Sequence, residues 1–98
     1  MQMELLVTYD VTTDTKAGRR RLRKVAKVCE AYGQRVQKSV FECMLSRAQF
    51  EQFKHRLQQE IDPEEDSLRI YRLREPRDKY LQVLGKELQH DLQNPLII

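Results

Sequence analysis

Apolar residues recur with two different periods along the chain, and the changes of period predict alternating strands and helices. A short apolar run over residues 3–9, closed by the polar residues 10–15, is typical of a strand. Residues 15–32 are expected to form an amphipathic helix, because apolar side chains follow the i, i+3, i+4, i+7 spacing at Leu22, Val25, Ala26 and Cys29. Gly33 then supplies a helix stop.

The second half of the chain repeats this order of elements. Residues 35–45 mix alternation with β-branched and aromatic side chains, which predicts either a tight hairpin broken near Lys38 and Ser39 or one bulged strand. Ser46 and Gln49 form a capping-box pattern at the start of a second helix. The apolar stripe of that helix is Phe50, Phe53, Leu57 and Ile61.

Two further strands are expected after the second helix. Pro63 ends that helix, because proline lacks the amide hydrogen that a helix interior needs. Residues 67–73 have the pattern of a strand, and residues 80–84 that of a short fifth one. The order β-α-β-β-α-β, followed by this short C-terminal strand, predicts an α+β, ferredoxin-like fold in which two helices cover one face of an antiparallel sheet.

Length and composition indicate one domain. With 98 residues and 40% hydrophobic content the chain can form one small core, so we expect a single domain over residues 1–98 whose last part, about 88–98, is a tail. A core this small favours association with a second copy. The apolar runs are too short to span a membrane and the N-terminus lacks a leader pattern, which predicts a soluble, cytoplasmic protein.

Positive charge is concentrated between residues 16 and 27, where no acidic residue occurs. Most of these cations lie opposite the apolar stripe of the helix, and the candidate nucleic-acid-binding residues are Lys16, Arg19, Arg20, Arg23, Lys24 and Lys27. Without acidic neighbours for i,i+4 ion pairs the cations repel one another, and a phosphate backbone would relieve that repulsion. The two interpretations are a sequence-independent phosphate-binding surface and a solvated basic helix.

Few other residues have a pattern that indicates chemistry. Asp10 ends the first apolar strand, where a carboxylate can offer the oxygen ligands that Mg²⁺ prefers; an ordinary loop or capping residue is the alternative. The acidic residues 62–66 lack the ligand spacing of an EF-hand, and we expect a solvated turn there. Cys29 and Cys43 lie far apart in the sequence and are expected to be buried, reduced thiols.

The sequence resembles the small CRISPR-associated Cas-two family in three segments that occur in the same order and at matching spacing. These segments are LLVTYDV at residues 5–11, GQRVQKSVFEC at residues 33–43 and SLRIYRL at residues 67–73. The basic helix and the run LGKE at residues 84–87 are also similar to the family. The closing DLQNPLII, at residues 91–98, resembles the type I-C branch.

The resemblance implies a homodimer that handles double-stranded DNA or RNA. Members of the family are metal-dependent endonucleases, and they also form a scaffold for spacer integration with the Cas-one integrase. The aspartate that ends the family's first strand is its catalytic metal ligand and matches Asp10, which implies one Mg²⁺ per dimer between the two Asp10 carboxylates. Residues that stand near this site by the same resemblance are Tyr9, Arg35, Ser39 and Phe41.

Two other functions fit parts of the pattern. One is a purely architectural DNA-binding scaffold without nuclease activity in the cell. The other is a ferredoxin-like module that senses a small molecule. This last interpretation leaves the basic helix unexplained, and the sequence has no glycine-rich ligand loop.

Overall fold

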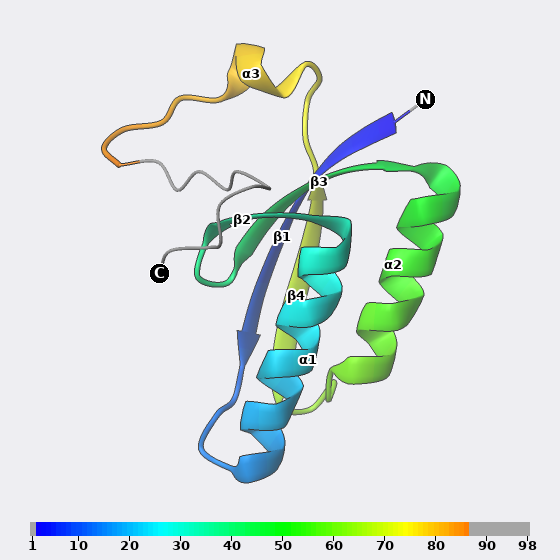
Figure 1. The fold of residues 1–98 in the computed structure, drawn as a ribbon, viewed down its shortest axis with the longest axis vertical. Coiled ribbons are helices and arrows are strands. Elements are labelled where there is room, and N and C mark those ends of the chain that lie inside the picture. Colours follow the sequence, from blue (N-terminus) through cyan, green and yellow to red (C-terminus); the bar gives the residue numbers. More distant parts are fainter. Residues whose placement is uncertain (1, 87–98) are drawn as a thin grey trace.

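The chain, described by a computed structural model over residues 2–86, forms one four-stranded antiparallel sheet with its two long helices packed on one face (Figure 1). Its elements in chain order are β1 (Gln2–Val11), α1 (Lys16–Tyr32), β2 (Gly33–Gln37), β3 (Val40–Ser46), α2 (Arg47–Glu60), β4 (Asp66–Arg72) and the short α3 (Arg77–Tyr80). The strand order is β2-β3-β1-β4, so β1 and β3 are central and β2 and β4 are the edges. The predicted ferredoxin-like fold is confirmed.

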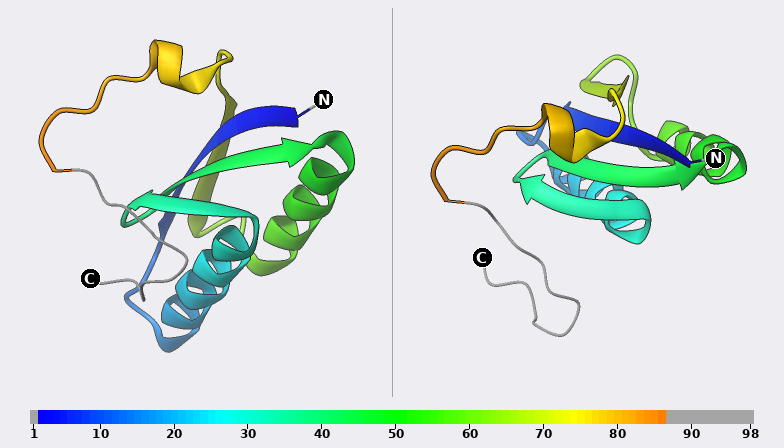
Figure 2. Two further views of the ribbon diagram at one scale, coloured as in Figure 1. Left: turned by 45° about the horizontal axis from the view of Figure 1, so that its top comes forward. Right: turned by 90° about the horizontal axis from the view of Figure 1, so that it is seen from above.

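Side chains of β1 alternate between the two faces of the sheet. Leu5, Val7 and Tyr9 are buried in the core, to which α1 and α2 also contribute. Both long helices lie over the same face of the sheet (Figure 2). The even-numbered residues point to the other face, which α1 and α2 leave uncovered and which we call the open face. The strand register places on it Leu6, Thr8 and Asp10 of β1, Glu42 and Met44 of β3, and Ser67, Arg69 and Tyr71 of β4.

The segment between the two long helices combines both predicted alternatives. Lys38 and Ser39 form a turn between β2 and β3, so the segment is a hairpin. The register of the ladder shifts between Arg35 and Gln37, which marks a bulge in the first strand. The hairpin therefore carries its irregularity on the edge strand β2, and the central strand β3 stays regular.

Local chemistry fixes the ends of the long helices. The capping box is confirmed: the Ser46 hydroxyl accepts a hydrogen bond from the Gln49 N–H at 3.2 Å, and the Gln49 side chain accepts one from the Ser46 N–H at 2.9 Å. Helix α1 ends where predicted, but Gly33 is extended, with φ −158°. Glycine is needed there for space, because a Cβ would lie 2.5 Å from the Glu42 carbonyl oxygen.

The predicted fifth strand does not form within the single chain. Tyr80 ends α3, and residues 81–86 belong to no helix or strand. A strand needs hydrogen bonds to the backbone of a neighbouring strand, and residues 81–84 pair with no strand of the described sheet. The predicted tail over residues 88–98, with its resemblance to the type I-C branch, lies outside the described residues.

Candidate nucleic-acid interface and metal site

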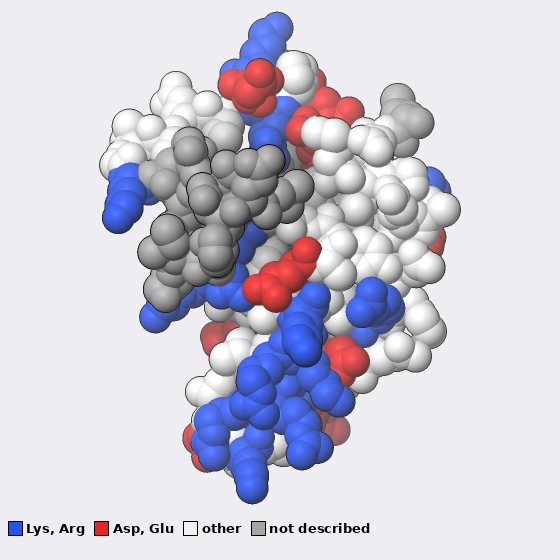
Figure 3. Space-filling model, in the orientation of Figure 1, with Lys and Arg blue, Asp and Glu red and all other residues white. Residues whose placement is uncertain are grey.

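Helix α1 carries a dense group of cations on its outer side (Figure 3). We call this the basic surface; it consists of the exposed side chains of Lys16, Arg19, Arg20, Arg23, Lys24 and Lys27. None of these side chains forms an ion pair with another residue in the range 2–86. The structure thus brings all the predicted cations together, and it leaves their charge available to an anionic partner.

Arg21 belongs to the same helix but differs from the basic surface. Its guanidinium donates two hydrogen bonds to the Asp66 carboxylate, at 2.8 Å and 3.3 Å. Its side chain is 20% exposed, and that of Asp66 is 0% exposed. Two parallel hydrogen bonds of this kind fix both the distance and the orientation of the pair. Arg21 therefore ties α1 to the start of β4.

Asp66 corrects the prediction of a solvated acidic turn at residues 62–66. Its carboxylate also accepts hydrogen bonds from the Asp62 N–H at 2.9 Å and the Thr12 N–H at 3.3 Å. Burial raises the pKa of this carboxyl, but the hydrogen bonds from Arg21 and from the two N–H groups outweigh burial and hold the pKa below its ordinary value. The Asp66 carboxylate is therefore buried and ionised, and it connects Arg21, Asp62 and Thr12. Glu64 remains exposed as predicted.

Asp10 lies near the end of β1 on the open face, with its side chain exposed. Its cross-strand neighbour is Ser67 of β4, and the next pair along the sheet is Thr8 with Arg69. Within residues 2–86, no group of three or more His, Cys, Asp or Glu side chains could hold a metal ion. One chain therefore offers a single carboxylate here, and a metal site needs further ligands from outside the chain.

The other residues expected near Asp10 form a cluster of their own. Tyr9 and Phe41 are buried in the core with ring centroids 6.2 Å apart, and the Arg35 guanidinium lies 5.0 Å from the Phe41 ring centroid. The Ser39 carbonyl oxygen accepts a hydrogen bond from the Tyr9 N–H at 3.1 Å. By strand alternation these rings lie on the face opposite to Asp10. The structure therefore brings the cluster together but turns its rings away from Asp10.

Burial makes the phenol and thiol groups of this core poor acids and poor nucleophiles. It raises the pKa of Tyr9 to about 12, with Cys29 adding to the rise and Arg35 opposing it. It likewise raises the pKa of Cys29 to about 12 and that of Cys43 to about 11. Both cysteines are free and buried, as predicted. All three groups stay protonated at neutral pH, so they serve packing rather than proton transfer.

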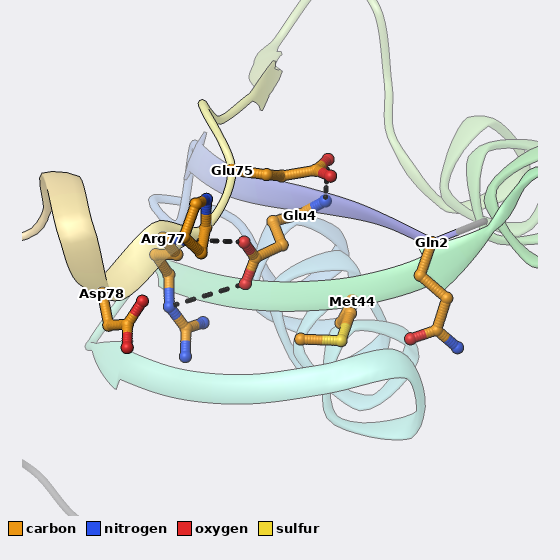
Figure 4. A pocket seen from close by; sticks show the side chains of 7 residues that line it. Gln2, Glu4, Met44, Glu75, Arg77 and Asp78 are labelled. Atoms are coloured by element: carbon orange, nitrogen blue, oxygen red, sulfur yellow. Dashed lines mark hydrogen bonds and ion pairs between the residues drawn. The ribbon is translucent and has the colours of Figure 1, made fainter.

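A second group of charges, which the sequence did not lead us to expect, holds the segment after β4 on the open face (Figure 4). Glu4 is buried, and its carboxylate accepts a hydrogen bond from the Arg77 N–H at 2.8 Å. The Arg77 guanidinium lies 3.0 Å from Glu42 and 4.0 Å from Glu4. Glu75 accepts a hydrogen bond from the Glu4 N–H at 3.4 Å. The available signal was the carboxylate within the apolar run of residues 3–9.

Comparisons with known proteins agree with this architecture. The family model for CRISPR associated protein Cas2 matches residues 3–81. A CRISPR-associated endoribonuclease Cas2 of Moorella thermoacetica is 62% identical over 96 residues, which are 98% of this chain and 100% of that protein. A CRISPR-associated endonuclease Cas2 of Halalkalibacterium halodurans is 50% identical over 95 residues, 97% of this chain and 99% of that protein.

A solved structure gives the same result. The crystal structure of Streptococcus pyogenes Cas2 at pH 6.5 matches with a TM-score of 0.76 at 55% identity, over 85% of this chain and 100% of that one. No helix within residues 2–86 is long and apolar enough to cross a membrane. The sequence motifs, the strand order and these relatives all agree: the chain belongs to the CRISPR-associated Cas2 family and is an enzyme of the nuclease class.

Proposed function

We propose that the chain acts as a homodimer that binds double-stranded nucleic acid through the basic surface and cleaves phosphodiester bonds with Mg²⁺ held at Asp10. The observation that carries this proposal is the row of exposed cations on α1 that have no ion-pair partner among residues 2–86. Such a row costs self-repulsion, which contact with phosphates relieves. Phosphate contacts position a protein on the duplex and carry no base information directly.

The basic surface has the length that duplex binding needs. At a rise of about 1.5 Å per residue, the helix from Lys16 to Lys27 spans roughly 16 Å. Duplex DNA carries one charge per about 1.7 Å of its axis, so this length faces several phosphates. Binding should therefore be sequence-independent and should weaken steeply with salt.

Asp10 suits a Mg²⁺ site that two chains share. Its carboxylate is exposed and offers the oxygen ligands that hard cations prefer. A two-fold axis through the open face would bring two such carboxylates together, and water and phosphate oxygens would complete the coordination. Bound Mg²⁺ would neutralise phosphate charge and lower the pKa of a water ligand. The contribution of the chain is to hold Asp10 at a fixed place on a regular strand.

Exposed apolar side chains support the dimer. On the open face, Met44 is 53% and Tyr71 is 44% exposed. After α3, Leu81 is 41%, Val83 47% and Leu84 93% exposed. Covering apolar surface contributes about 25 cal/mol per Å². Residues 81–84 would also gain a strand partner at the sheet edge of a second copy, so the fifth strand belongs to the proposed dimer.

The placement of the two sites favours a second, architectural function. The basic surface lies on the outer side of α1, whereas the Asp10 side chain lies on the open face of the sheet. A duplex held along α1 therefore contacts cations that face away from the metal site of the same chain. A protein that binds a duplex without cutting it suits a scaffold for spacer integration, and the Cas-one integrase is the expected partner.

One experiment separates these functions. Duplex DNA and duplex RNA of the same sequence are incubated with the wild-type protein in Mg²⁺ and in EDTA, and both cleavage and binding are measured. We expect binding in both solutions and cleavage in Mg²⁺ alone. Binding without cleavage would leave only the architectural function. Cleavage in EDTA, or no duplex binding, would contradict the proposal.

A further inference from the structure

We propose that Asp66 is a positioning residue for the nuclease reaction: it fastens the strand end that carries Asp10 to the helix that carries the basic surface, and it keeps Arg21 out of that surface. The inference rests on the function proposed above, because it concerns a site built around Asp10. The Asp66 side chain is 0% exposed, so it acts through the residues that it holds.

Distant parts of the chain meet at the Asp66 carboxylate. It accepts hydrogen bonds from Arg21 of α1, from the Asp62 N–H after α2, and from the Thr12 N–H after β1. Asp66 also pairs with Val11 in the β1–β4 ladder. The carboxylate thus links the end of β1 and the start of β4 to the basic helix. The Thr12 hydroxyl, which donates to the Glu65 carbonyl oxygen, links the two strand ends to each other but not to the helix.

This junction lies next to Asp10 on both strands. Asp10 pairs with Ser67, the residue directly after Asp66, and Thr12 follows Asp10 by two positions. The direction of the Asp10 carboxylate depends on these last ladder pairs, because strand ends fray when their anchors are lost. A metal ligand has to be held within roughly 0.5 Å of its productive position. Loss of the Asp66 anchor should therefore impair chemistry more than binding.

The same carboxylate sets the charge of the basic surface. Arg21 stands beside Arg20 in the sequence, yet it is paired and only 20% exposed. Its charge is neutralised by Asp66, so it does not add to the surface. Removing the Asp66 charge would release one cation at the border of the basic surface. If that cation reaches a phosphate, the salt dependence of binding steepens by about 0.9 in log affinity per log salt.

Asp66→Asn is the informative variant, since asparagine keeps the size of the side chain and removes its charge. We expect kcat for Mg²⁺-dependent cleavage to fall between about 10- and 100-fold without a rise in KM, because the released Arg21 can only add to duplex binding. The salt slope should steepen by about 0.9. In the double variant Asp66→Asn with Arg21→Gln, the slope should return to the wild-type value while kcat stays low. Glu51→Gln is the matched control.

The control removes one carboxylate from the exposed ion pair of Glu51 with Lys54 on α2, at 3.4 Å, so it changes net charge equally. All proteins are measured at a temperature where circular dichroism shows them folded. Wild-type kcat in Asp66→Asn would overturn the positioning role, and a wild-type slope would overturn the role of Arg21. If Asp66→Asn does not fold, Arg21→Lys replaces it: kcat should fall with the slope unchanged, and unchanged kcat contradicts the proposal. Cleavage by Asp10→Ala at the wild-type rate would contradict the proposed site instead.

Discussion

Tyr9 and Asp10 are consecutive residues of β1 whose side chains lie on opposite faces of the sheet. Tyr9 is buried and packs near Phe41, whereas Asp10 is exposed on the open face. Packing of the Tyr9 side chain in the core therefore holds the backbone of Asp10 in place. A substitution at Asp10 can remove a carboxylate from a rigid position and leave the core intact.

Replacing Asp10 with alanine should abolish Mg²⁺-dependent cleavage. We expect the rate to fall at least about 100-fold, which is about 2.7 kcal/mol of activation free energy. Melting temperature and duplex affinity should stay close to wild type, because neither depends on an exposed carboxylate of the open face. Asp14→Ala, at an exposed position of the following loop, is the control. Equal cleavage rates in the two variants would show that Asp10 holds no essential metal.

Replacing the outward cations of α1 should flatten the salt dependence of duplex binding. If Arg20, Arg23, Lys24 and Lys27 each meet a phosphate, their joint change to glutamine should reduce the slope of log affinity against log salt by about 3.6, at about 0.9 per contact. The measurement is fluorescence anisotropy with labelled duplex between 50 and 300 mM salt. Base preference should hardly change.

The control for this variant changes Arg47, Lys54 and Arg56 of α2 to glutamine. Arg47 and Lys54 already face Glu51, so they have less free charge to offer a phosphate. We expect a small general loss of affinity and the wild-type slope. A solvated helix α1 that never touches nucleic acid would give the same result for both sets of substitutions.

Truncation after residue 79 should weaken the dimer. It removes residues 80–98, among them residues 80–84, whose exposed apolar side chains are proposed to cover a second copy and to add a strand to its sheet. Sedimentation velocity over a range of concentrations should show a wild-type dimer at micromolar concentration. The truncated chain should have a larger dissociation constant and be mainly monomeric at that concentration. Equal dissociation constants would remove this segment from the interface, and a monomeric wild type would contradict the dimer itself.

Arg77→Ala should loosen the segment after β4. The variant loses the 3.0 Å contact with Glu42 and leaves the buried Glu4 carboxylate with the backbone N–H alone. A buried carboxylate that loses its positively charged partner and keeps a single hydrogen bond costs about 1–3 kcal/mol, which urea unfolding would measure. Lys79→Ala, an exposed position of the same short helix, should change stability by less than about 0.5 kcal/mol. Equal effects of both substitutions would show that the Arg77 contacts are not stabilising.

Acid should erase the stabilising effect of Asp66. The hydrogen bonds to its carboxylate outweigh burial and hold the folded-state pKa below the ordinary 3.8. A lowered pKa stabilises the fold above the ordinary value, and the contribution is lost as pH falls through the folded-state pKa. The difference in unfolding free energy between wild type and Asp66→Asn should be constant above about pH 5 and shrink at lower pH. A difference that stays constant down to pH 3 would contradict this assignment.

Periodic patterns explain why most of the fold could be predicted. The apolar run of residues 3–9 is long enough to predict a strand, and the helical spacing in α1 is long enough to predict the buried side of that helix. The capping box at Ser46 needs only neighbouring residues, so it too was predictable. The strand expected at residues 80–84 was different, because a strand needs a ladder partner and no strand of the described sheet pairs with these residues.

The candidate site could be predicted only where its residues belong to one helix or strand and their spacing in the sequence determines their positions. The basic surface depends on the spacing of cations within α1, which the sequence displays. Asp66 depends on contacts with Arg21 and Thr12, more than 40 positions away in the sequence, and no local pattern distinguishes it from a solvated turn residue. The face occupied by Arg35 depends on the β2–β3 register, which shifts at the bulge beside it.

β2 and β4 are the edge strands of the described sheet, so each pairs with a neighbouring strand on one side alone. Edge strands readily accept foreign strands and so promote aggregation. Here β4 carries Arg69 and Arg72, and β2 is interrupted by its bulge beside Arg35. The positive charge on β4 and the bulge in β2 both disfavour regular pairing with a strand of another chain. The edge strands of this sheet therefore carry features that oppose the flat stacking of strands that leads to fibrils.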